Sequence, residues 1–400
     1  MATYTPQGEY MLTQVAIIGA GPAGLLLGAH LSATGIDNVI IEKQSADYVL
    51  SRIRAGVLES GTVQQLRTLG LAARIDVEGL VHGGLEIAFD GRRRRIDLGA
   101  RTGGRKVTVY GQTEVTRDLM GARKNSNALT IYDADVVLPV DFDGQTPKVQ
   151  FKKNGQQYEI QCDFIVGTDG YHGICRASVP SKSIQEFERI FPFAWLGVLA
   201  DVPPVSDELI YVNHERGFAL CSMRSPTRSR YYLQCAVDEN SNAWSINRFW
   251  DEIRTRLDAE AAARVTTGPA LEMSVAPLRS FVAEPLRFGR MFLAGDAGHI
   301  VPPTGAKGLN LAASDVYYLA GALREFYEEK SSAGLDAYSG KALTRVWQAV
   351  RFSSELTALT HRNDKASPFD RRIQLAELAR LTDNLSVQTA FAESYTGPPY

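Results

Sequence analysis

Short apolar runs alternate with amphipathic stretches at the start of the chain. Residues 14–18 form an apolar run typical of a buried strand, a glycine-rich turn follows, and residues 22–34 have the pattern of a helix. A second apolar run at residues 38–42 comes after Gly35, so the three segments predict a strand–helix–strand unit. Short strands and helices alternate from there to the apolar run at residues 163–166, which ends in Gly-Thr-Asp-Gly.

The middle of the chain has longer β segments. Alternating apolar and polar positions between proline-containing turns predict strands at residues 193–199, 208–212, 217–224 and 229–237. A short buried strand at 291–294 and a helix over 309–327 follow, and the remainder is mostly helical in pattern. The predicted fold class is therefore α/β (α+β): a Rossmann-like domain with an inserted β-sheet substrate domain and a C-terminal helical region.

Composition and charge narrow the class of protein. A chain of 400 residues exceeds the usual size of one domain, so one large or two interlocked domains are expected. A net charge of −2 gives no general attraction to nucleic acid or to an anionic membrane, and no apolar run reaches membrane-spanning length. The start of the chain lacks the pattern of a signal peptide. The four cysteines form no CxxC pair and no histidine cluster has metal-ligand spacing, so we expect reduced thiols, no metal and a cytoplasmic location.

The turn after the first strand carries a dinucleotide-binding pattern. Gly19-Ala20-Gly21-Pro22-Ala23-Gly24 fits G-x-G-x-x-G between a strand and a helix. Its glycines permit the tight turn, the close approach of backbone to a pyrophosphate and close helix–strand packing. Glu42 ends the next strand, where a carboxylate accepts hydrogen bonds from a ribose diol. Gly19, Gly21, Gly24 and Glu42 are therefore predicted to bind the cofactor.

Four parts of the chain are expected on this basis. Residues 1–12, polar and rich in turn formers, are predicted to be a flexible extension. The cofactor-binding domain is discontinuous and comprises 13–82, 106–185 and 279–330. The substrate-binding sheet domain comprises 83–105 and 186–278. Residues 331–400 form a C-terminal helical and interface region.

The hairpin at residues 217–237 carries the chemistry of an anion receptor. Side chains two apart on a strand share a face, so polar and apolar residues of each strand should line one side of the hairpin. These residues are Phe218, Leu220, Ser222 and Arg224 on one strand and Arg230 and Tyr232 on the other. Guanidinium groups beside apolar side chains suit a carboxylate on a small apolar body. An exposed face with solvated arginines is the alternative that the pattern alone leaves open.

Two later motifs bear on the identity of the dinucleotide. Asp169-Gly170 follows the strand at 163–166, and Gly295-Asp296 follows the strand at 291–294. In this order the three motifs resemble those of the flavoprotein hydroxylases, which implies FAD as the cofactor. No second G-x-G-x-x-G occurs, so a nicotinamide would dock without a Rossmann domain of its own. The alternative is a disulfide reductase with two Rossmann domains. The absence of a second glycine motif and of a redox CxxC argues against it.

Three longer stretches make the resemblance more specific. Residues 52–59, 109–118 and 305–315 resemble the 4-hydroxybenzoate hydroxylases of the group A flavoprotein aromatic hydroxylase family, and the similarity covers nearly the whole chain after about Thr13. The resemblance implies hydroxylation of 4-hydroxybenzoate to 3,4-dihydroxybenzoate with NADPH and O2 through a flavin C4a-hydroperoxide. It also implies a homodimer that works in aromatic catabolism.

Roles at the substrate also come from the resemblance. It implies that Arg224 binds the substrate carboxylate with the help of Ser222 and Tyr232. It implies that the phenol end of the substrate meets a set of groups that accept and return its proton. They are Tyr211, the adjoining Tyr395, His82 at the solvent end of a proton relay, and the backbone carbonyl of Pro303.

The resemblance further implies which residues serve the two cofactors. Lys307 and Asn310 would tune the flavin environment and Arg230 would help to hold the flavin in position. The expected FAD contacts are Arg52, Arg54, Gln112, Asp296, Leu309 and Asn310. The expected NADPH contacts are Lys43, Tyr48, His172 and Arg279. A cation at Lys43 favours NADPH over NADH because it can pair with the 2′-phosphate.

Two other functions remain open from the sequence alone. One is a related hydroxylase that acts on 3-hydroxybenzoate or on 3,4-dihydroxybenzoate, because the size of the pocket is not visible in a sequence. The other is a non-catalytic protein that keeps an FAD-binding fold. The intact set of Ser222, Arg224, Tyr211 and Tyr395 argues against this second alternative.

Overall fold

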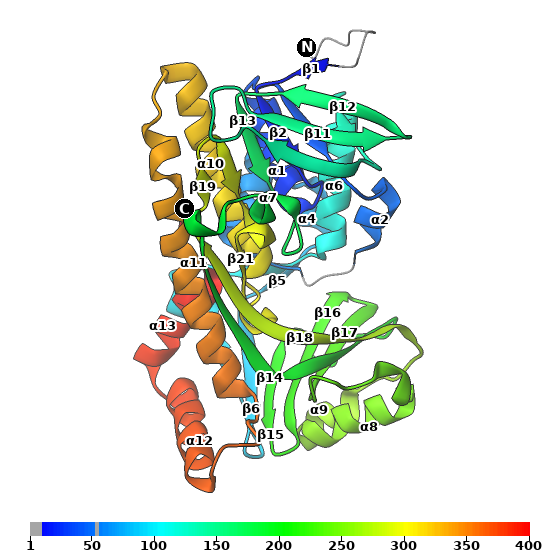
Figure 1. Cartoon of the computed structure of the whole chain (residues 1–400). Helices are drawn as coiled ribbons and strands as arrows, with labels where there is room; N and C mark the ends of the chain where they lie inside the picture. The colour runs from blue at the N-terminus through cyan, green and yellow to red at the C-terminus, as the bar shows by residue number, and fades with distance from the viewer. Residues whose placement is uncertain (1–9, 53–55) are drawn as a thin grey trace.

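A central parallel sheet carries the glycine-rich turn. The computed structural model describes residues 10–52 and 56–400, and its six-stranded sheet has the order β19-β20-β13-β2-β3-β9 (Figure 1). All neighbours in this sheet are parallel except β19 and β20. Its strands are β2 (Val15–Ile18), β3 (Asn38–Ile41), β9 (Thr130–Ile131), β13 (Phe164–Gly167), β19 (Arg287–Phe288) and β20 (Met291–Leu293). The sequence predicted β2, β3, β13 and β20 to within one residue at each end.

Helices cover one face of this sheet and a second sheet covers the other. Helices α1, α6 and α10 share one hydrophobic core with the six-stranded sheet. The four-stranded sheet has the order β1-β12-β11-β10, and its buried side chains Val149, Phe151 and Ile160 join the same core. Its strands are β1 (Tyr10–Leu12), β10 (Asp135–Val140), β11 (Lys148–Lys153) and β12 (Gln156–Gln161).

The predicted extension at residues 1–12 is wrong in part. Residues 10–12 form β1, which pairs in parallel with β12 through Met11 and Ile160. Backbone hydrogen bonds to a neighbouring strand outweigh the polar, turn-forming composition that suggested a loose segment. Residues 1–9 lie outside the described residues.

The eight-stranded sheet is the largest and forms the lower part of the molecule in Figure 1. Its order is β21-β18-β14-β17-β16-β15-β6-β7, so it joins strands from four separate stretches of the chain. Its strands are β6 (Gly84–Phe89), β7 (Arg92–Asp97), β14 (Gln185–Ala200), β15 (Ile210–His214), β16 (Gly217–Ser225), β17 (Arg228–Cys235), β18 (Ala270–Glu284) and β21 (His299–Ile300). The strand predicted at 193–199 is only the second half of β14, because residues 185–190 continue the pairing with β18.

The two faces of this sheet belong to different cores. Phe218 and Leu220 of β16 face one core with Trp195 and Tyr395, whereas Ala219 and Cys221 face another core with α8 and α9. This alternation follows the two-residue period that the sequence analysis assumed for the hairpin. A small three-stranded sheet has the order β4-β8-β5, and its strands are β4 (Val57–Glu59), β8 (Val107–Val109) and β5 (Leu80–His82).

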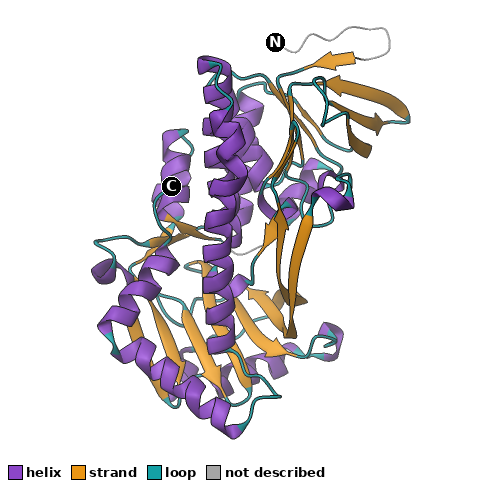
Figure 2. Ribbon diagram, turned by 60° about the vertical axis from the view of Figure 1, so that its left-hand side comes forward, coloured by secondary structure: helices purple, strands orange, loops and turns teal. Residues whose placement is uncertain are grey.

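Long helices run along both parts of the molecule. Helix α11 extends beside the six-stranded sheet and down past the eight-stranded one, while α12 and α13 fold back around the lower part (Figures 1 and 2). The helices are α1 (Pro22–Ala33), α2 (Ala46–Ser51), α3 (Ser60–Thr68), α4 (Ala73–Glu78), α5 (Leu98–Arg101), α6 (Gln112–Asn125), α7 (Ile174–Ala177), α8 (Ile246–Arg256), α9 (Ala259–Arg264), α10 (Gly308–Glu329), α11 (Ala333–Thr360), α12 (Pro368–Asp383) and α13 (Leu385–Thr396).

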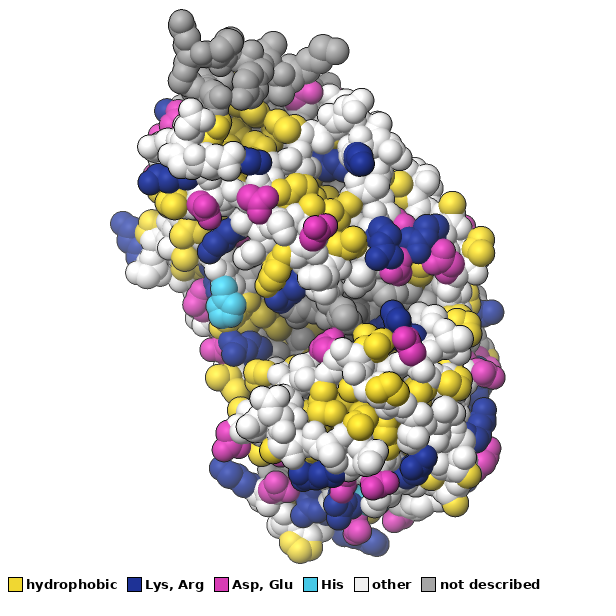
Figure 3. Space-filling model, turned by 90° about the vertical axis from the view of Figure 1, so that its right-hand side faces the viewer, with side chains coloured by type: hydrophobic (Ala, Val, Ile, Leu, Met, Phe, Trp, Pro, Cys, Tyr) yellow, Lys and Arg dark blue, Asp and Glu magenta, His cyan; other side chains and the backbone are white. Residues whose placement is uncertain are grey.

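The surface carries mixed charge. On the face in Figure 3, basic and acidic side chains are interspersed over both halves of the molecule, and no large field of one sign stands out. This distribution agrees with the near-neutral net charge of −2. Within the described residues no helix is long and apolar enough to cross a membrane.

Candidate active site

A cavity opens where β2, β13 and β20 end. It has a volume of about 370 Å³ and its walls come from the glycine-rich turn, α2, α6 and the loop before α10. Of the predicted FAD contacts that the structure describes, most line it: Gly19, Gly21, Glu42, Arg52, Gln112, Asp296 and Leu309, whereas Gly24, Arg230 and Asn310 do not. Tyr48, predicted to contact NADPH, and Pro303 and Lys307, predicted to act in catalysis, line it too. Asp169 and Gly170 of the second motif line it as well. The predicted contact Arg54 lies outside the described residues.

The three glycines of the turn have separate structural roles. Gly19 has φ +111°, and a Cβ there would lie 2.5 Å from the carbonyl oxygen of Thr168. A Cβ on Gly24 would lie 2.0 Å from the Gly19 carbonyl oxygen, so this position needs glycine for helix–strand packing. A Cβ on Gly21 would meet no protein atom within 4 Å. The space above Gly21 is open, which is the cradle that a pyrophosphate at the start of a helix requires.

Carboxylates hold the loops around this cavity. Glu42 Oε2 accepts a hydrogen bond from the Ala20 backbone N–H at 2.7 Å, and its Oε1 accepts one from Gln44 at 2.8 Å. Behind Asp296, which lines the cavity, the fully buried Asp315 accepts from the Gly295 N–H at 2.8 Å and contacts His299 Nε2 at 2.6 Å. Burial lowers the pKa of His299, but the carboxylates of Asp315 and Asp296 together with a backbone hydrogen bond leave that pKa raised. This pair fixes the Gly295-Asp296 turn and was not predicted from the sequence.

The hairpin β16–β17 brings the predicted anion receptor together. Ser222 pairs with Arg230 across the strands and Leu220 with Tyr232, so these four side chains share a face. Arg224 Nη1 lies 3.5 Å from Ser222 Oγ and donates to the Met223 carbonyl at 2.8 Å. Burial lowers the pKa of Arg224, an effect that Tyr232 partly offsets.

Arg224 lacks a carboxylate partner in the described part of the chain. No ion pair involves it, and its Nε has no hydrogen-bond partner among the described residues. An uncompensated guanidinium away from bulk water is costly unless an anion pairs with it. The arrangement therefore favours a site for a carboxylate beside Ser222 and Tyr232.

The second arginine of the hairpin is already paired. Arg230 Nη1 lies 3.0 Å from Glu272 Oε2 on β18, and its guanidinium stands 5.1 Å from the centre of the Tyr232 ring. Arg230 is not among the residues that line the dinucleotide cavity. Glu272 was not predicted, because a residue 42 positions along the chain gives no spacing signal.

A buried tyrosine pair lies between the hairpin and the dinucleotide cavity. The hydroxyl of Tyr211, on β15, lies 3.0 Å from that of Tyr395, on α13, and it donates to the Thr304 carbonyl at 3.0 Å. Pro303, which precedes Thr304, lines the cavity, so the pair and the cavity share one loop. The Pro303 carbonyl itself accepts from the Ala306 N–H. Thr304 was missed because a backbone acceptor carries no mark in a sequence.

Both tyrosines are protonated at neutral pH. Burial raises the pKa of Tyr211 well above its usual value, and the neighbouring Tyr395 adds to the effect. Burial also raises the pKa of Tyr395 to about 12, while its hydrogen bond to Tyr211 acts in the opposite direction. The two hydroxyls can therefore pass a proton along their hydrogen bond but do not hold a negative charge at rest.

His82 is buried, although we expected it to face solvent. It ends β5 and only 2% of its surface is exposed. Burial lowers the pKa of His82, and nearby Glu208 and Asp207 act in the opposite direction. Neither ring nitrogen has a hydrogen-bond partner among the described residues. Two unpartnered nitrogens in a buried ring are the sites where ordered water would bind.

The loop before α10 contributes a dense polar network. Asn310 accepts from the Glu59 N–H and from Thr62 Oγ1, both at 2.8 Å, and donates to the carbonyls of Val57 and Ala306, both at 2.9 Å. Its amide is therefore fully satisfied and fixed in orientation. Lys307 Nζ lies 2.7 Å from Glu59 Oε1 and donates to the Tyr395 carbonyl at 2.8 Å. Glu59 lies in one of the motif stretches, but its partnership with Lys307 was not predicted.

The predicted nicotinamide residues form two separate groups. Lys43 and Tyr48 are exposed beside the cavity, and the Tyr48 hydroxyl accepts from Arg52 at 2.9 Å. His172 and Arg279 both adjoin Tyr171, with a ring-centroid distance of 4.8 Å and a guanidinium-to-ring distance of 4.9 Å. Arg279 also pairs with Glu188 at 3.2 Å.

A histidine that sequence reasoning passed over completes the apolar wall behind Tyr211. His361 Nε2 accepts from the Trp195 indole N–H at 2.6 Å, and its ring stacks on Phe218 at 4.1 Å. Burial lowers the pKa of His361 to about 3, so the ring is neutral. Among the residues described, no group of three or more His, Cys, Asp or Glu side chains is placed to hold a metal ion.

Comparisons with known proteins identify the family of the chain. The sequence profile of the FAD binding domain matches residues 12–353. The p-hydroxybenzoate hydroxylase of Acinetobacter baylyi is 57% identical over 392 residues, which is 98% of this chain and 97% of that protein. A 3-(3-hydroxy-phenyl)propionate/3-hydroxycinnamic acid hydroxylase of Burkholderia cenocepacia is 24% identical, with 77% of this chain and 56% of that protein aligned.

Solved structures share the fold. The p-nitrophenol 4-monooxygenase of Pseudomonas putida superposes with a TM-score of 0.83 at 18% identity and covers 97% of this chain and 100% of its own. A ternary complex of aklavinone-11 hydroxylase with FAD and aklavinone superposes with a TM-score of 0.73 at 20% identity, over 87% of this chain and 69% of its own. At these identities the likeness is one of architecture.

Proposed function

The chain belongs to the flavoprotein aromatic hydroxylases that carry the FAD binding domain, and from this membership we propose that it hydroxylates 4-hydroxybenzoate to 3,4-dihydroxybenzoate with NADPH and O2. The observation that carries the proposal is the half-buried Arg224, which has no carboxylate partner among the described residues and lies on β16, the strand on which Leu220 pairs with Tyr211. A ring acid with its carboxylate at one end and its phenol at the other matches these two groups. A non-catalytic FAD-binding protein would require neither Arg224 nor the tyrosine pair.

The cavity fits FAD. The open space above Gly21, the carboxylate of Glu42 at the end of β3 and the exposed Asp296 supply a pyrophosphate cradle and acceptors for sugar hydroxyls. When bound, FAD supplies the oxygen chemistry, by taking electrons from NADPH and activating O2 for transfer to the ring. The protein then contributes positioning, proton control and exclusion of water.

The Gly21→Ala variant tests this assignment of the cavity. The added Cβ meets no protein atom within 4 Å, so the variant should fold normally. It should nevertheless bind FAD about 10- to 100-fold more weakly, because it displaces a phosphate hydrogen-bonded to backbone N–H groups. Fluorescence titration of the apoprotein measures this affinity. Gly121→Ala is the control, since its Cβ is equally free and lies on α6 away from the cavity; equal FAD affinity in both variants would refute the assignment.

Substrate orientation follows from the two ends of the pocket. Arg224 would bind the carboxylate through its planar guanidinium, with Ser222 and Tyr232 as neighbouring hydroxyl groups. The phenol would then lie at the Tyr211 hydroxyl, beside the loop that borders the FAD cavity. This orientation leaves the carbon next to the phenol facing the flavin.

Proton control would fall to the tyrosine pair. A phenolate donates electron density to its ortho carbon much better than a phenol, so removal of the phenol proton promotes hydroxylation. Tyr211 would accept that proton as it passes its own to Tyr395, and Tyr395 would in turn release its own proton. His82, whose ring nitrogens have no partner among the described residues, would take up that proton through ordered water and pass it to solvent. His82 suits the last step because imidazole titrates near neutrality, and burial lowers its pKa toward the neutral, accepting form.

The related-hydroxylase alternative is tested by the products. Purified protein reconstituted with FAD is supplied with NADPH and, separately, with 4-hydroxybenzoate, 3-hydroxybenzoate and 3,4-dihydroxybenzoate, and products are identified by mass spectrometry. We expect 4-hydroxybenzoate to stimulate NADPH oxidation. We also expect nearly one 3,4-dihydroxybenzoate to form for each NADPH consumed. Efficient conversion of either other acid, with none of 4-hydroxybenzoate, would overturn the substrate assignment.

NADPH preference is assigned to Lys43. Lys43 is exposed and lies between Glu42 and Gln44, which line the cavity, so its ammonium could pair with a 2′-phosphate there. Lys43→Ala should lower kcat/KM for NADPH by about 5- to 10-fold, as for a charge-assisted hydrogen bond at a partly exposed site, and leave NADH unchanged. Steady-state assays with both coenzymes measure this effect, with the exposed Lys341→Ala as control. An equal loss with NADH would remove Lys43 from coenzyme selection.

We also propose a homodimer in the cytoplasm. The described residues include a groove of about 710 Å³ between α11, α12 and α13, and apolar Phe369 and Ile373 are exposed on α12. All four cysteines are free thiols, as a reducing compartment requires. Light scattering coupled to size-exclusion chromatography measures the mass in solution.

A further inference from the structure

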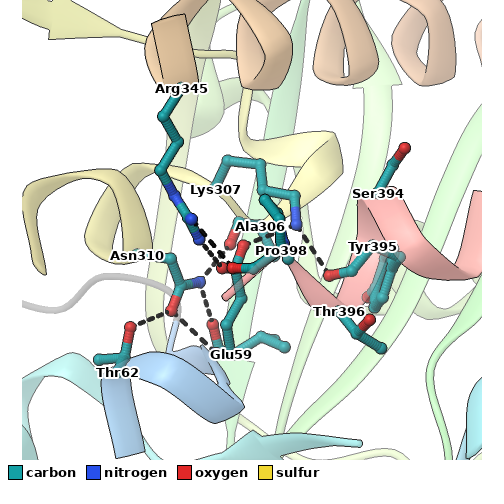
Figure 4. Close-up of polar contacts among 12 residues, drawn as sticks. Glu59, Thr62, Ala306, Lys307, Asn310, Arg345, Ser394, Tyr395, Thr396 and Pro398 are labelled. Carbon is teal, nitrogen blue, oxygen red and sulfur yellow. Dashed lines mark hydrogen bonds and ion pairs between the residues drawn. The ribbon is translucent and has the colours of Figure 1, made fainter. Parts of the chain in front are cut away.

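Residues 397–400 lie against the polar network beside the cavity, and Figure 4 shows Pro398 of this segment next to Glu59 and Arg345. They follow α13, which carries Tyr395, and they contact α3, α10 and α11 at once. The hydroxylation proposed above assigns them no role.

The network contains a charged trio, which we define as Glu59, Lys307 and Arg345. Glu59 Oε1 lies 2.7 Å from Lys307 Nζ, and Glu59 Oε2 lies 2.9 Å from Arg345 Nη2. All three side chains are buried. One carboxylate with two cations leaves the trio with a net positive charge, and Lys307 itself lines the cavity. That positive charge favours electron uptake by a bound flavin, because reduction adds negative charge to it.

Residues 397–400 contact Arg345 and Glu59 of the trio. Arg345 Nη1 donates to the Pro398 carbonyl at 2.9 Å, and its guanidinium stands 4.5 Å from the centre of the Tyr400 ring. Gly397, at φ +76°, lies so close to Glu59 that a Cβ would be 1.8 Å from Oε2. Arg105 Nη1 donates to the Gly397 carbonyl at 2.7 Å and holds the backbone in this place. The segment therefore covers the trio and keeps water from it.

Tyr400 connects the segment to Asn310. Thr62 Oγ1 donates to Asn310 Oδ1 at 2.8 Å, so the Tyr400 hydroxyl, 3.0 Å from Thr62 Oγ1, must be the donor in the next bond. Asn310 in turn joins β4 to the loop before α10. Val57 of β4 and Ala306 of the loop both line the cavity. The relative position of these two walls thus depends on a chain of hydrogen bonds that begins at Tyr400.

We infer that residues 397–400 are a positioning element for the flavin: Tyr400 fixes the two cavity walls through Thr62 and Asn310, and the segment shields the charged trio so that its positive charge acts on the flavin ring. The inference rests on the proposed function only in taking FAD as the occupant of the cavity. It goes beyond that function in naming residues that touch neither the ring acid nor the reacting atoms.

Two variants and a matched control test the inference. Tyr400→Phe keeps the ring over Arg345 and removes only the hydroxyl, so the Kd of the apoprotein for oxidised FAD should rise about 3- to 10-fold. Deletion of residues 397–400 also admits water to the trio, so its Kd should rise more. In the deletion variant, the affinity for reduced FAD should fall about tenfold more than the affinity for oxidised FAD. This difference corresponds to a drop of about 30 mV in the two-electron reduction potential of the bound flavin. Tyr158→Phe, on β12, should change neither quantity, because its hydroxyl bonds the exposed Gln156.

The outcomes separate positioning from mere stability. A lower Tm of the apoprotein, with unchanged Kd for FAD and unchanged potential in both variants, would overturn the inference and leave the proposed function intact. Failure of the unaltered protein to bind FAD would overturn both. If the deletion variant does not fold, the Kd of Tyr400→Phe relative to Tyr158→Phe decides alone: a rise supports the inference and equality overturns it.

Discussion

Arg224→Ala is expected to raise the KM for 4-hydroxybenzoate by roughly 30-fold to several thousand-fold. Removal of one member of a buried, hydrogen-bonded charge pair costs about 2–5 kcal/mol, and each 1.4 kcal/mol is about tenfold in affinity. Arg224 has no carboxylate partner among the described residues, so the substrate would supply the missing one. Steady-state kinetics and direct titration of the substrate measure the loss.

A matched control is available on the neighbouring strand. Arg228 lies on β17, pairs with Asp201 at 2.6 Å, and has about half of its side chain exposed, at 47%. Arg228→Ala should leave KM within about twofold of the unaltered value, because exposed ion pairs contribute little. The same KM in Arg224→Ala and Arg228→Ala would remove Arg224 from the carboxylate site and with it the proposed orientation of the substrate.

Tyr211→Phe is expected to separate NADPH oxidation from hydroxylation. The ring keeps its packing against Phe218 and Tyr395, so substrate should still bind. Product formation should fall by about 10²- to 10⁴-fold, the usual contribution of a general acid–base group, and most of the electrons should appear as hydrogen peroxide. Rapid-reaction measurement of flavin reduction, together with assays of peroxide and product, checks each part.

The control is the same Tyr-to-Phe substitution at a position outside the site. Tyr158→Phe removes a hydroxyl far from the cavity, on β12 of the four-stranded sheet. It should retain the yield of product per NADPH consumed. A normal yield in Tyr211→Phe as well would mean that the phenol proton leaves by another path.

Much of the fold was predictable because local patterns sufficed. The strand–helix–strand unit at β2, α1 and β3 has a fixed period, a proline at the first turn of the helix and glycines where backbone must approach closely. The hairpin was predictable for the same reason, since alternation places Leu220 and Ser222 on one face. β1 was not, because its three residues gain their strand conformation only from pairing with a distant strand.

The parts of the site that were missed depend on long-range contacts. Glu272 pairs with the predicted Arg230, and Asp315 holds the predicted Gly295 turn, yet nothing in their spacing indicates which group they will meet. Arg345 pairs with Glu59, and neither residue was predicted as part of the site. Thr304 acts through its backbone carbonyl, which every residue has. His82 was placed at solvent by analogy with its role, but burial depends on the packing of β5, which its own sequence does not determine.

A crystal structure of the complex with FAD and 4-hydroxybenzoate tests the central claim most directly. The measured quantities are the distances from the substrate carboxylate to the Arg224 guanidinium and from the substrate hydroxyl to the Tyr211 hydroxyl. Both should lie within hydrogen-bonding range, with the carbon next to the phenol facing the isoalloxazine ring. A substrate bound in the reverse direction, or an Arg224 turned into solvent, would contradict the account.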